Sequence, residues 1–152
     1  IGWIILMTPE QSLLEGLSIL DPYMKQKGFD RASVLTGEGS GGNFAYSSYF
    51  KEGWILELHF RYSLGLVTYR FNETRLDHVN YMKLLGVYGQ NKYPGFSTDS
   101  KSSFERLLFD LDNFCSDFLT GSGEDFKRLA QKLGQNSEMF KGLKGFEKYI
   151  KN

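Results

Sequence analysis

The sequence predicts an α+β fold, in which an N-terminal helix precedes an antiparallel four-stranded meander and three or more C-terminal helices pack on one face of the sheet. Apolar residues recur at helical spacing before residue 28 and after residue 74, and they alternate with polar residues in between. The 152 residues suit one α+β domain, 1–152, with one substantial core. Residues 1–6 are set apart as a non-native or disordered extension, because Met7 directly precedes the first helix signal.

The first helix is predicted to begin at Pro9. Thr8 can act as its N-cap, and Gln11 can complete a capping box that satisfies two backbone amides. Gly28 supplies a left-handed stop. Between these signals, four apolar residues share one face: Leu13, Leu17, Leu20 and Met24. Pro22 removes an amide and crowds the preceding turn, so we expect a kink or two short helices here.

Strands are predicted between residues 29 and 71. The clearest covers 54–62, and its residues alternate between a core face (Trp54, Leu56, Leu58, Phe60 and Tyr62) and a polar face (Ile55, Glu57, His59 and Arg61). Strands over 43–50 and 66–71 flank it, and a weaker one covers 29–36. The glycine-rich stretch 37–42 is interpreted as a flexible hairpin connection, because no Gly-Lys-Ser/Thr motif of a phosphate-binding loop is present and a strand follows.

Helices are predicted again after the sheet, over residues 74–86, 102–121 and 122–133, with a further short one around Phe146 and Ile150. Thr74, Ser102 and Ser122 would cap the first three. The second has a broad apolar face, and its opposite side is expected to carry three solvated residues: Asp110, Asn113 and Asp117.

Composition and charge narrow the classes of function. Thirteen Phe, nine Tyr and two Trp exceed what a core of this size needs, so some are expected in a groove or a partner interface. The net charge is zero, although the chain from Lys127 onward holds seven basic residues against two acidic ones. Without a nucleic-acid motif or an overall basic charge, nucleic acid is an unlikely partner.

Location and redox state follow from the cysteine count and the apolar runs. Cys115 is the only cysteine, so no intrachain disulfide can form, and we expect a cytoplasmic protein. The apolar opening run is far too short to span a bilayer, so no membrane association is expected. We expect Cys115 to be a small buried hydrophobe, since it falls on the apolar face of a helix. His78 lacks the converging ligands of a zinc site, so neither a metal ion nor a cofactor is expected.

The polar face of the strand over 54–62 is the first candidate binding site. Glu57, His59 and Arg61 share this face, and Arg70 can join them from the next strand together with Thr68. Such groups could transfer protons near an anionic substrate. They could equally form the ordinary cross-strand ion pairs of a wet sheet face, which is the simpler interpretation.

The loop 87–101 is the second candidate, because long ordered loops often carry function. Tyr93 and Phe96 flank Pro94 and Gly95 and could serve as aromatic anchors for a partner. Alternatively they pin the loop to its own core.

The sequence therefore predicts a small interaction protein that binds a protein partner and regulates or neutralises it, as a bacterial toxin-neutralising protein does. No catalytic residue is assigned. The binding residues predicted are Glu57, His59, Arg61, Arg70, Tyr93 and Phe96. The alternative is a small enzyme or ligand-binding domain that uses Glu57, His59, Arg61 and Arg70 on the polar sheet face. The oligomeric state and the identity of the partner stay open.

Overall fold

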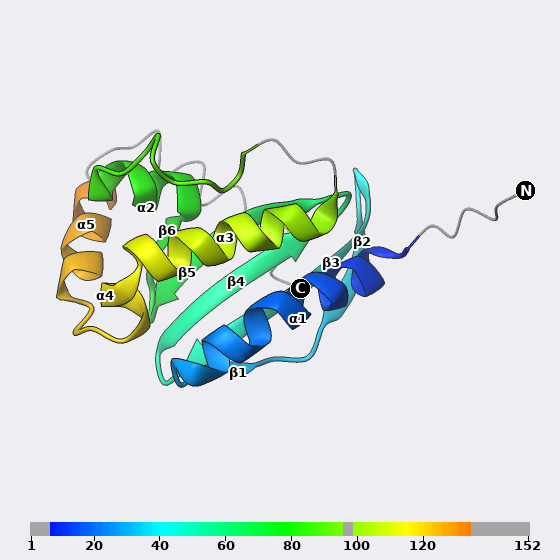
Figure 1. The fold of residues 1–152 in the computed structure, drawn as a ribbon, viewed down its shortest axis with the longest axis horizontal. Coiled ribbons are helices and arrows are strands. Elements are labelled where there is room, and N and C mark those ends of the chain that lie inside the picture. Colours follow the sequence, from blue (N-terminus) through cyan, green and yellow to red (C-terminus); the bar gives the residue numbers. More distant parts are fainter. Residues whose placement is uncertain (1–6, 96–98, 135–152) are drawn as a thin grey trace, which may run out of the picture.

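A computed structural model, which describes residues 7–95 and 99–134, shows an antiparallel sheet with helices against one of its faces (Figure 1). The strands are β1 (Asp30–Arg31), β2 (Leu35–Gly39), β3 (Gly42–Lys51), β4 (Trp54–Phe60), β5 (Leu64–Phe71) and β6 (Thr74–Asp77). The helices are α1 (Pro9–Gln26), α2 (His78–Leu85), α3 (Ser100–Phe114), α4 (Ser116–Leu119) and α5 (Glu124–Gly134). The α+β class is confirmed. The predictions for residues 1–6, for Phe96 and for a helix around Phe146 and Ile150 lie outside the described residues.

Among residues 7–95 and 99–134 the sheet has six strands, so the predicted count of four is wrong. Their order is β1-β3-β4-β5-β6, and β2 also pairs with β3. The weak strand expected over 29–36 is two short strands, which pair with opposite ends of β3: Asp30 lies across from Phe50, and Leu35 lies across from Tyr46. The meander itself is present as β3 to β6.

The sixth strand, β6, occupies residues where a helix was predicted. The chain reverses after β5 through Asn72, whose φ of 54° lies in the left-handed region that Asn tolerates in tight turns. Thr74–Asp77 then pairs with β5, so the helix α2 begins only at His78, with Asp77 in the N-cap position. The predicted end of this helix is confirmed, since Gly86 caps it with a φ of 79°.

The strand predicted over 54–62 is confirmed as extended, although it ends at Phe60. Leu56, Leu58 and Phe60 are buried in the core as expected. Tyr62 was also predicted on the core face, but its side chain is 82% exposed. The pairing of β4 with β5 becomes irregular between Leu58 and Phe60, and the alternation stops at the turn into β5.

The helix α1 has the predicted capping box at Thr8 and Gln11. It continues without interruption to Gln26, so the expected division into two helices is wrong. Pro22 is exposed, whereas Leu20 and Met24 are buried on either side of it in sequence. Because the Pro22 ring lies on the solvent side, it does not disturb the buried face of α1. Packing of that face stabilises the helix where Pro22 lacks a backbone amide.

The predicted helix over 102–121 is in fact two helices, α3 and α4, separated at Cys115. The first begins earlier than expected because Asp99 is its N-cap and accepts a hydrogen bond from the Ser102 backbone amide at 2.8 Å. The following helix is present as α5, although it begins only at Glu124: Ser122 accepts a hydrogen bond from the Glu124 amide at 3.2 Å, and Asp117 accepts hydrogen bonds from the Gly123 and Phe126 amides at 3.2 and 3.0 Å.

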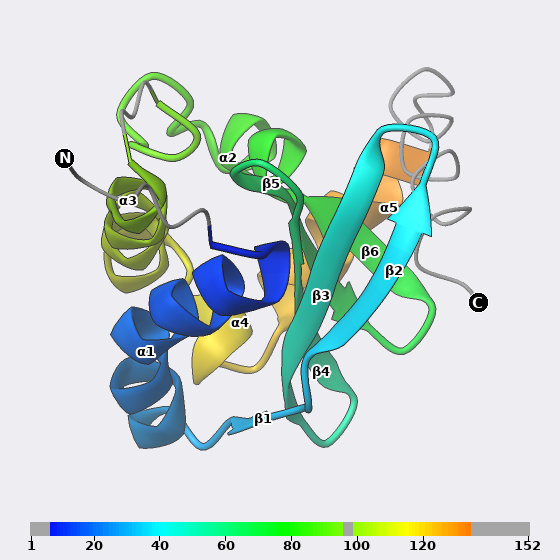
Figure 2. The same cartoon turned by 90° about the vertical axis from the view of Figure 1, so that its right-hand side faces the viewer.

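The helices α1, α3 and α4 lie on one side of the sheet (Figure 2), and we call this side the inner face. The core forms between these helices and the inner face, which contributes Tyr49, Leu56 and Tyr69. We call the opposite side the outer face. Its side chains alternate with those of the core along β3 to β6: Phe44, Tyr46, Ser48, Phe50, Ile55, Glu57, His59, Leu66, Thr68, Arg70, Arg75 and Asp77. Within residues 7–95 and 99–134, no helix is both long and apolar enough to cross a membrane.

Candidate functional site

The centre of the outer face holds an ion pair between two of the predicted site residues, Glu57 and Arg70. Nη1 of Arg70 lies 3.5 Å from Oε2 of Glu57, and the Tyr46 hydroxyl donates a hydrogen bond to the same oxygen at 2.8 Å. The Glu57 side chain is only 3% exposed. Burial and the neighbouring carboxylate raise the pKa of Tyr46, so its hydroxyl stays protonated and keeps donating. Sequence reasoning missed Tyr46, which joins the pair from β3.

Cross-strand register arranges the outer face in rows of different charge. Glu57, Thr68 and Asp77 lie directly across from one another on β4, β5 and β6. The next row along the strands places Arg70 across from Arg75. Burial raises the pKa of Asp77, which weakens its negative charge at low pH. The acidic row and the basic row stabilise each other, because each carboxylate has an arginine as a diagonal neighbour on the adjacent strand.

His59 and Arg61, the other two predicted residues on β4, meet at a different place. The His59 ring stacks on Phe44 with a centroid separation of 5.1 Å, and the Arg61 guanidinium lies over the same Phe44 ring at 5.8 Å. Burial lowers the pKa of His59, and the charge of Arg61 lowers it further. The structure therefore groups Glu57 with Arg70, and His59 with Arg61, on the same face.

The glycine-rich stretch explains how Arg61 and Phe44 fit. It forms the β2–β3 hairpin, as predicted, with Gly39 paired to Gly42. A Cβ atom at Gly39 or Gly41 would overlap the Arg61 guanidinium, and a Cβ at Gly37 would lie 2.6 Å from the Phe44 ring. The glycines are thus required for two large side chains to lie against the hairpin backbone. The unusual density of glycine beside a strand was the signal for this packing.

The structure places Tyr93 inside the core, where its side chain is buried. Its hydroxyl donates to the backbone carbonyl of Leu64 at 2.8 Å and is also close to that of Gly65. Burial raises the pKa of the Tyr93 hydroxyl, which preserves it as a donor. These contacts fasten the loop after α2 to the turn between β4 and β5, and Tyr93 contributes nothing to the outer face.

A polar network in the core was not foreseen. His78 Nε2 lies 2.8 Å from Asp110 Oδ2, and His78 Nδ1 lies 2.7 Å from the Tyr69 hydroxyl. Asp110 also accepts hydrogen bonds from the backbone amides of Lys92 and Tyr93 at 2.7 and 2.9 Å. The expectation that Asp110 is solvated is wrong, because its side of α3 faces the buried loop rather than water. Its position three residues after Leu107, on the apolar face, was the available signal.

His78 and Asp110 have the functional groups of a catalytic dyad, but a substrate cannot reach them. His78 is 2% exposed and Asp110 is 0% exposed. Cys115, buried as predicted, adds an Sγ–Oη contact of 3.7 Å to Tyr69, and burial raises the pKa of its thiol to about 12. The geometry allows a donor chain in which the Cys115 thiol donates to the Tyr69 hydroxyl, this hydroxyl donates to Nδ1 of His78, and Nε2–H of His78 donates to Asp110. We interpret the network as a structural fastening between β5, α2 and α3.

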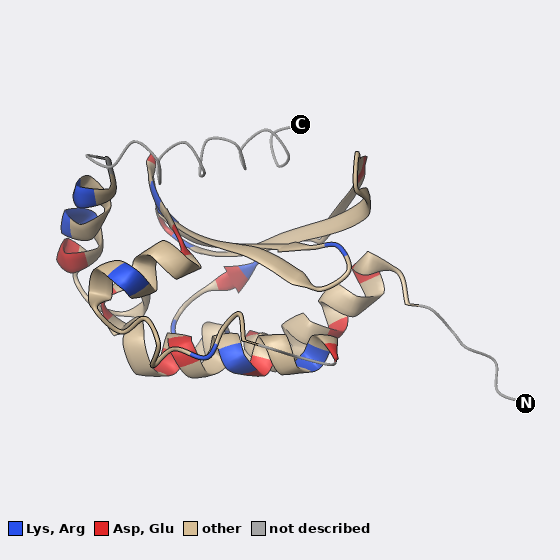
Figure 3. Ribbon diagram, turned by 90° about the horizontal axis from the view of Figure 1, so that it is seen from above, with Lys and Arg blue, Asp and Glu red and all other residues tan. Residues whose placement is uncertain are grey.

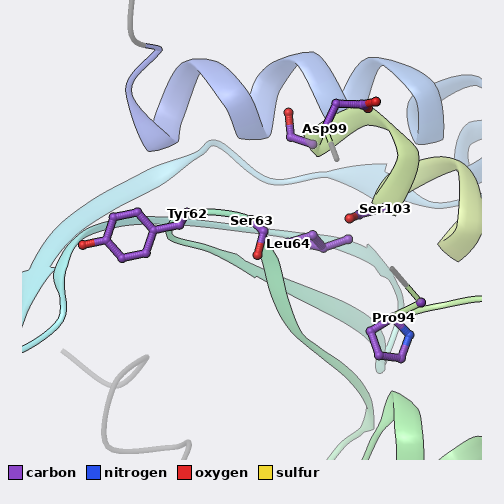
Figure 4. A pocket seen from close by; sticks show the side chains of 8 residues that line it. Tyr62, Ser63, Leu64, Pro94, Asp99 and Ser103 are labelled. Atoms are coloured by element: carbon purple, nitrogen blue, oxygen red, sulfur yellow. The ribbon is translucent and has the colours of Figure 1, made fainter. Parts of the chain in front are cut away.

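Two hollows lie away from the outer face. A cavity of about 250 Å³ is lined by Tyr62, Ser63, Leu64, Pro94, Gly95, Asp99, Ser100 and Ser103, between the β4–β5 turn and the start of α3 (Figure 4). A more open hollow of about 470 Å³ between α1 and α3 is lined by Tyr23, Gln26, Glu105, Leu108, Phe109, Asp112 and Asn113.

Within the described part of the chain, no group of three or more His, Cys, Asp and Glu side chains is placed to hold a metal ion. Comparisons with protein-family models, with curated proteins and with solved structures gave no match. The site must therefore be interpreted from its own geometry.

Proposed function

We propose that this protein is a small interaction protein that binds a protein partner through its outer sheet face and regulates or neutralises that partner. The observation that carries the proposal is the composition of this face, where aromatic Phe44 and Tyr46 lie among the cations of Arg61 and Arg70. Tyr, Phe and Arg are enriched in protein interfaces because they combine large apolar area with directed polar contacts.

The charges of the face favour an acidic partner. Arg70 is paired with Glu57, whereas the described contact of Arg61 is with the Phe44 ring. A guanidinium can bind a carboxylate of the partner through two parallel hydrogen bonds. An acidic surface on the partner would also be steered toward this face at low ionic strength.

The contacts of Glu57 support an interaction role over the alternative of an enzyme. Its carboxylate is nearly inaccessible, and Oε2 is already engaged by Arg70 and Tyr46. A general base needs an oxygen that can reach the proton of a substrate. With His59 stacked on Phe44 and the His78–Asp110 pair sealed in the core, the described polar groups serve packing and surface recognition. We place this activity in the cytoplasm, since the only cysteine is buried and unpaired with another.

Site-specific photo-crosslinking in living cells of the source organism tests the proposal. A benzophenone amino acid replaces either Phe50, on the outer face, or Leu14, on α1; both side chains are 40% exposed, so they form a matched pair. We expect the probe at Phe50 to capture one protein of defined mass and the probe at Leu14 to capture none. Substitution Arg61→Glu should lower the yield about tenfold or more, since it puts like charges across the interface.

Equal capture from both positions, or a yield at Phe50 that Arg61→Glu does not change, would contradict the proposal. The captured protein should also have an acidic surface at the crosslinked position. A crosslink to a basic surface would argue against the partner chemistry inferred from Arg61.

A further inference from the structure

We propose that the free edge of β2 is a docking site for an extended acidic segment of the partner, which pairs with β2 as an additional strand of the sheet. This inference rests on the proposed function, because it specifies how the partner of the outer face is held. Three observations carry it: an edge without protection, backbone groups that point away from the sheet, and the side chains that lie over the glycines of β2.

The two edges of the sheet differ in their protection. At one edge, β6 has only four residues, and α5 packs against it. At the other edge β2 pairs only with β3, and Figure 1 shows it at the opposite end of the fold from α5. Natural sheets protect an edge with proline, lysine, a bulge or a covering element. β2 has no proline or lysine and pairs with β3 in regular register.

The backbone of β2 presents free hydrogen-bonding groups at this edge. A loop of two residues, 40–41, joins β2 to β3. In such a hairpin the pair next to the loop is hydrogen-bonded, and bonded and non-bonded pairs then alternate. The odd-numbered residues of β2 therefore bond to β3, whereas the N–H and C=O groups of Thr36 and Glu38 point to the edge. Within residues 7–95 and 99–134, these groups have no hydrogen-bond partner outside the hairpin.

The outer side of β2 offers an apolar contact and a cation to an added strand. Leu35 is 61% exposed. Cβ atoms at Gly37 and Gly39 would lie 2.6 Å from the Phe44 ring and 2.8 Å from Nη2 of Arg61, so these two side chains lie over the glycines. An added strand would run about 4.8 Å from β2, within reach of both. The Arg61 guanidinium forms no ion pair in the described part of the chain, so it can pair with a carboxylate on that strand.

The charges of β2 define the pattern of the segment that fits. Figure 3 shows no Lys or Arg at the tip of the β2–β3 hairpin, and Glu38 is the only charged residue of β2. Successive side chains alternate, so Glu38 lies on the opposite side of β2 from Gly39 and Arg61. The segment should therefore be acidic on the side of Arg61 and uncharged on the side of Glu38.

Amide exchange followed by NMR in the purified protein tests the docking edge. Before any addition, the amides of Thr36 and Glu38 should exchange quickly and that of Gly37 slowly. The probe is a short capped peptide in which Glu and Thr alternate. At millimolar concentration it should slow exchange at Thr36 and Glu38 about threefold or more, whereas the same peptide with Lys in place of Glu should not. No slowing by the Glu peptide, or equal slowing by the Lys peptide, would overturn the inference.

Substitution of Thr36 tests the same edge in cells. Thr36→Pro removes the outward amide and keeps the bonds to β3, so it should lower capture of the partner by the photo-probe at Phe50 about tenfold or more. The matched control Thr36→Val keeps the amide, and capture should stay within about twofold. The buried Cys115 thiol reacts only on unfolding and so reports whether each variant is folded.

The outcomes separate this inference from the proposed function. Capture that Arg61→Glu abolishes and Thr36→Pro leaves unchanged would overturn the docking edge and leave the proposed function standing. Slower exchange with the Glu peptide, without any capture at Phe50, would do the reverse. A dimer of the purified protein that Thr36→Pro dissociates would identify a second copy of the chain as the occupant and overturn the inference.

Discussion

Replacing Asp110 with alanine is expected to lower the free energy of unfolding by about 3–5 kcal/mol, because it leaves buried hydrogen-bond donors without an acceptor. The carboxylate is inaccessible and accepts three hydrogen bonds, from the backbone amides of Lys92 and Tyr93 and from His78. Each buried donor left without an acceptor costs about 1–3 kcal/mol, so the sum agrees with that range after partial relaxation. A domain of this size is stable by about 5–15 kcal/mol, and the variant should be marginal.

Urea unfolding followed by tryptophan fluorescence measures this loss, since Trp54 packs against Phe71, Phe118 and Phe126 in the core. Asp112→Ala is the matched control, two residues further along α3, where the carboxylate accepts one exposed hydrogen bond from Tyr23 at 3.3 Å. It should cost less than about 1 kcal/mol. Hydrogen exchange should show early opening of the loop 87–95 only in Asp110→Ala. Equal destabilisation by the two substitutions would refute the assignment of the network as a structural fastening.

Three further substitutions test the outer face. Gly41→Ala should lower the free energy of unfolding by at most about 1 kcal/mol, because its Cβ meets only the far end of the flexible Arg61 side chain, which can move aside, whereas Ser40→Ala should be nearly neutral in the same urea titration. Asp77→Asn should stabilise the protein near pH 7. Burial raises the pKa of the Asp77 carboxyl in the folded state, so the stability of the wild type falls as the pH rises above the ordinary value of 3.8. The amide of Asn is an equally good N-cap and does not ionise. The gain should vanish below pH 3.8, and a gain independent of pH would contradict the assigned cause. The pKa of His59 is lowered in the folded state, so acidification below pH 6.5 protonates His59 more readily in the unfolded chain and lowers stability. His59→Gln should remove this part of the stability loss. An unchanged dependence of stability on pH would refute the prediction.

Local periodicity was sufficient to predict most elements and both faces of the sheet. The alternation in residues 54–60 placed Leu56 in the core and Glu57 on the opposite face, because successive side chains of a strand point to opposite sides. The capping box at Thr8 fixed the start of α1 for a similar reason, since all its partners lie within three residues. These signals are short-ranged, and the structure retains them.

The errors arose where tertiary pairing outweighed a local signal. Residues 74–77 resemble a helix start, yet they pair with β5 because the left-handed turn at Asn72 directs the chain back along that strand. Pro22 predicted a kink or a division of α1, yet α1 is one helix, in which burial of Leu20 and Met24 stabilises the turns around an exposed ring. In both cases a contact distant in space contributed more than the preference of a few residues.

The buried network of Asp110 and His78 shows why the candidate site was harder to predict than the fold. The two residues are 32 positions apart, and each has an ordinary surface interpretation in its own helix. Only packing of α3 against α2 and the loop 87–95 converts both into core groups, and no periodicity encodes which polar residues will meet. The same reasoning applies to Tyr46, whose bond to Glu57 requires the register of β3 against β4. Charge on a strand identifies the wet side of a sheet, but the partners of each charge are set by the register of the neighbouring strands, which is why the outer face has to be tested through substitutions such as Arg61→Glu.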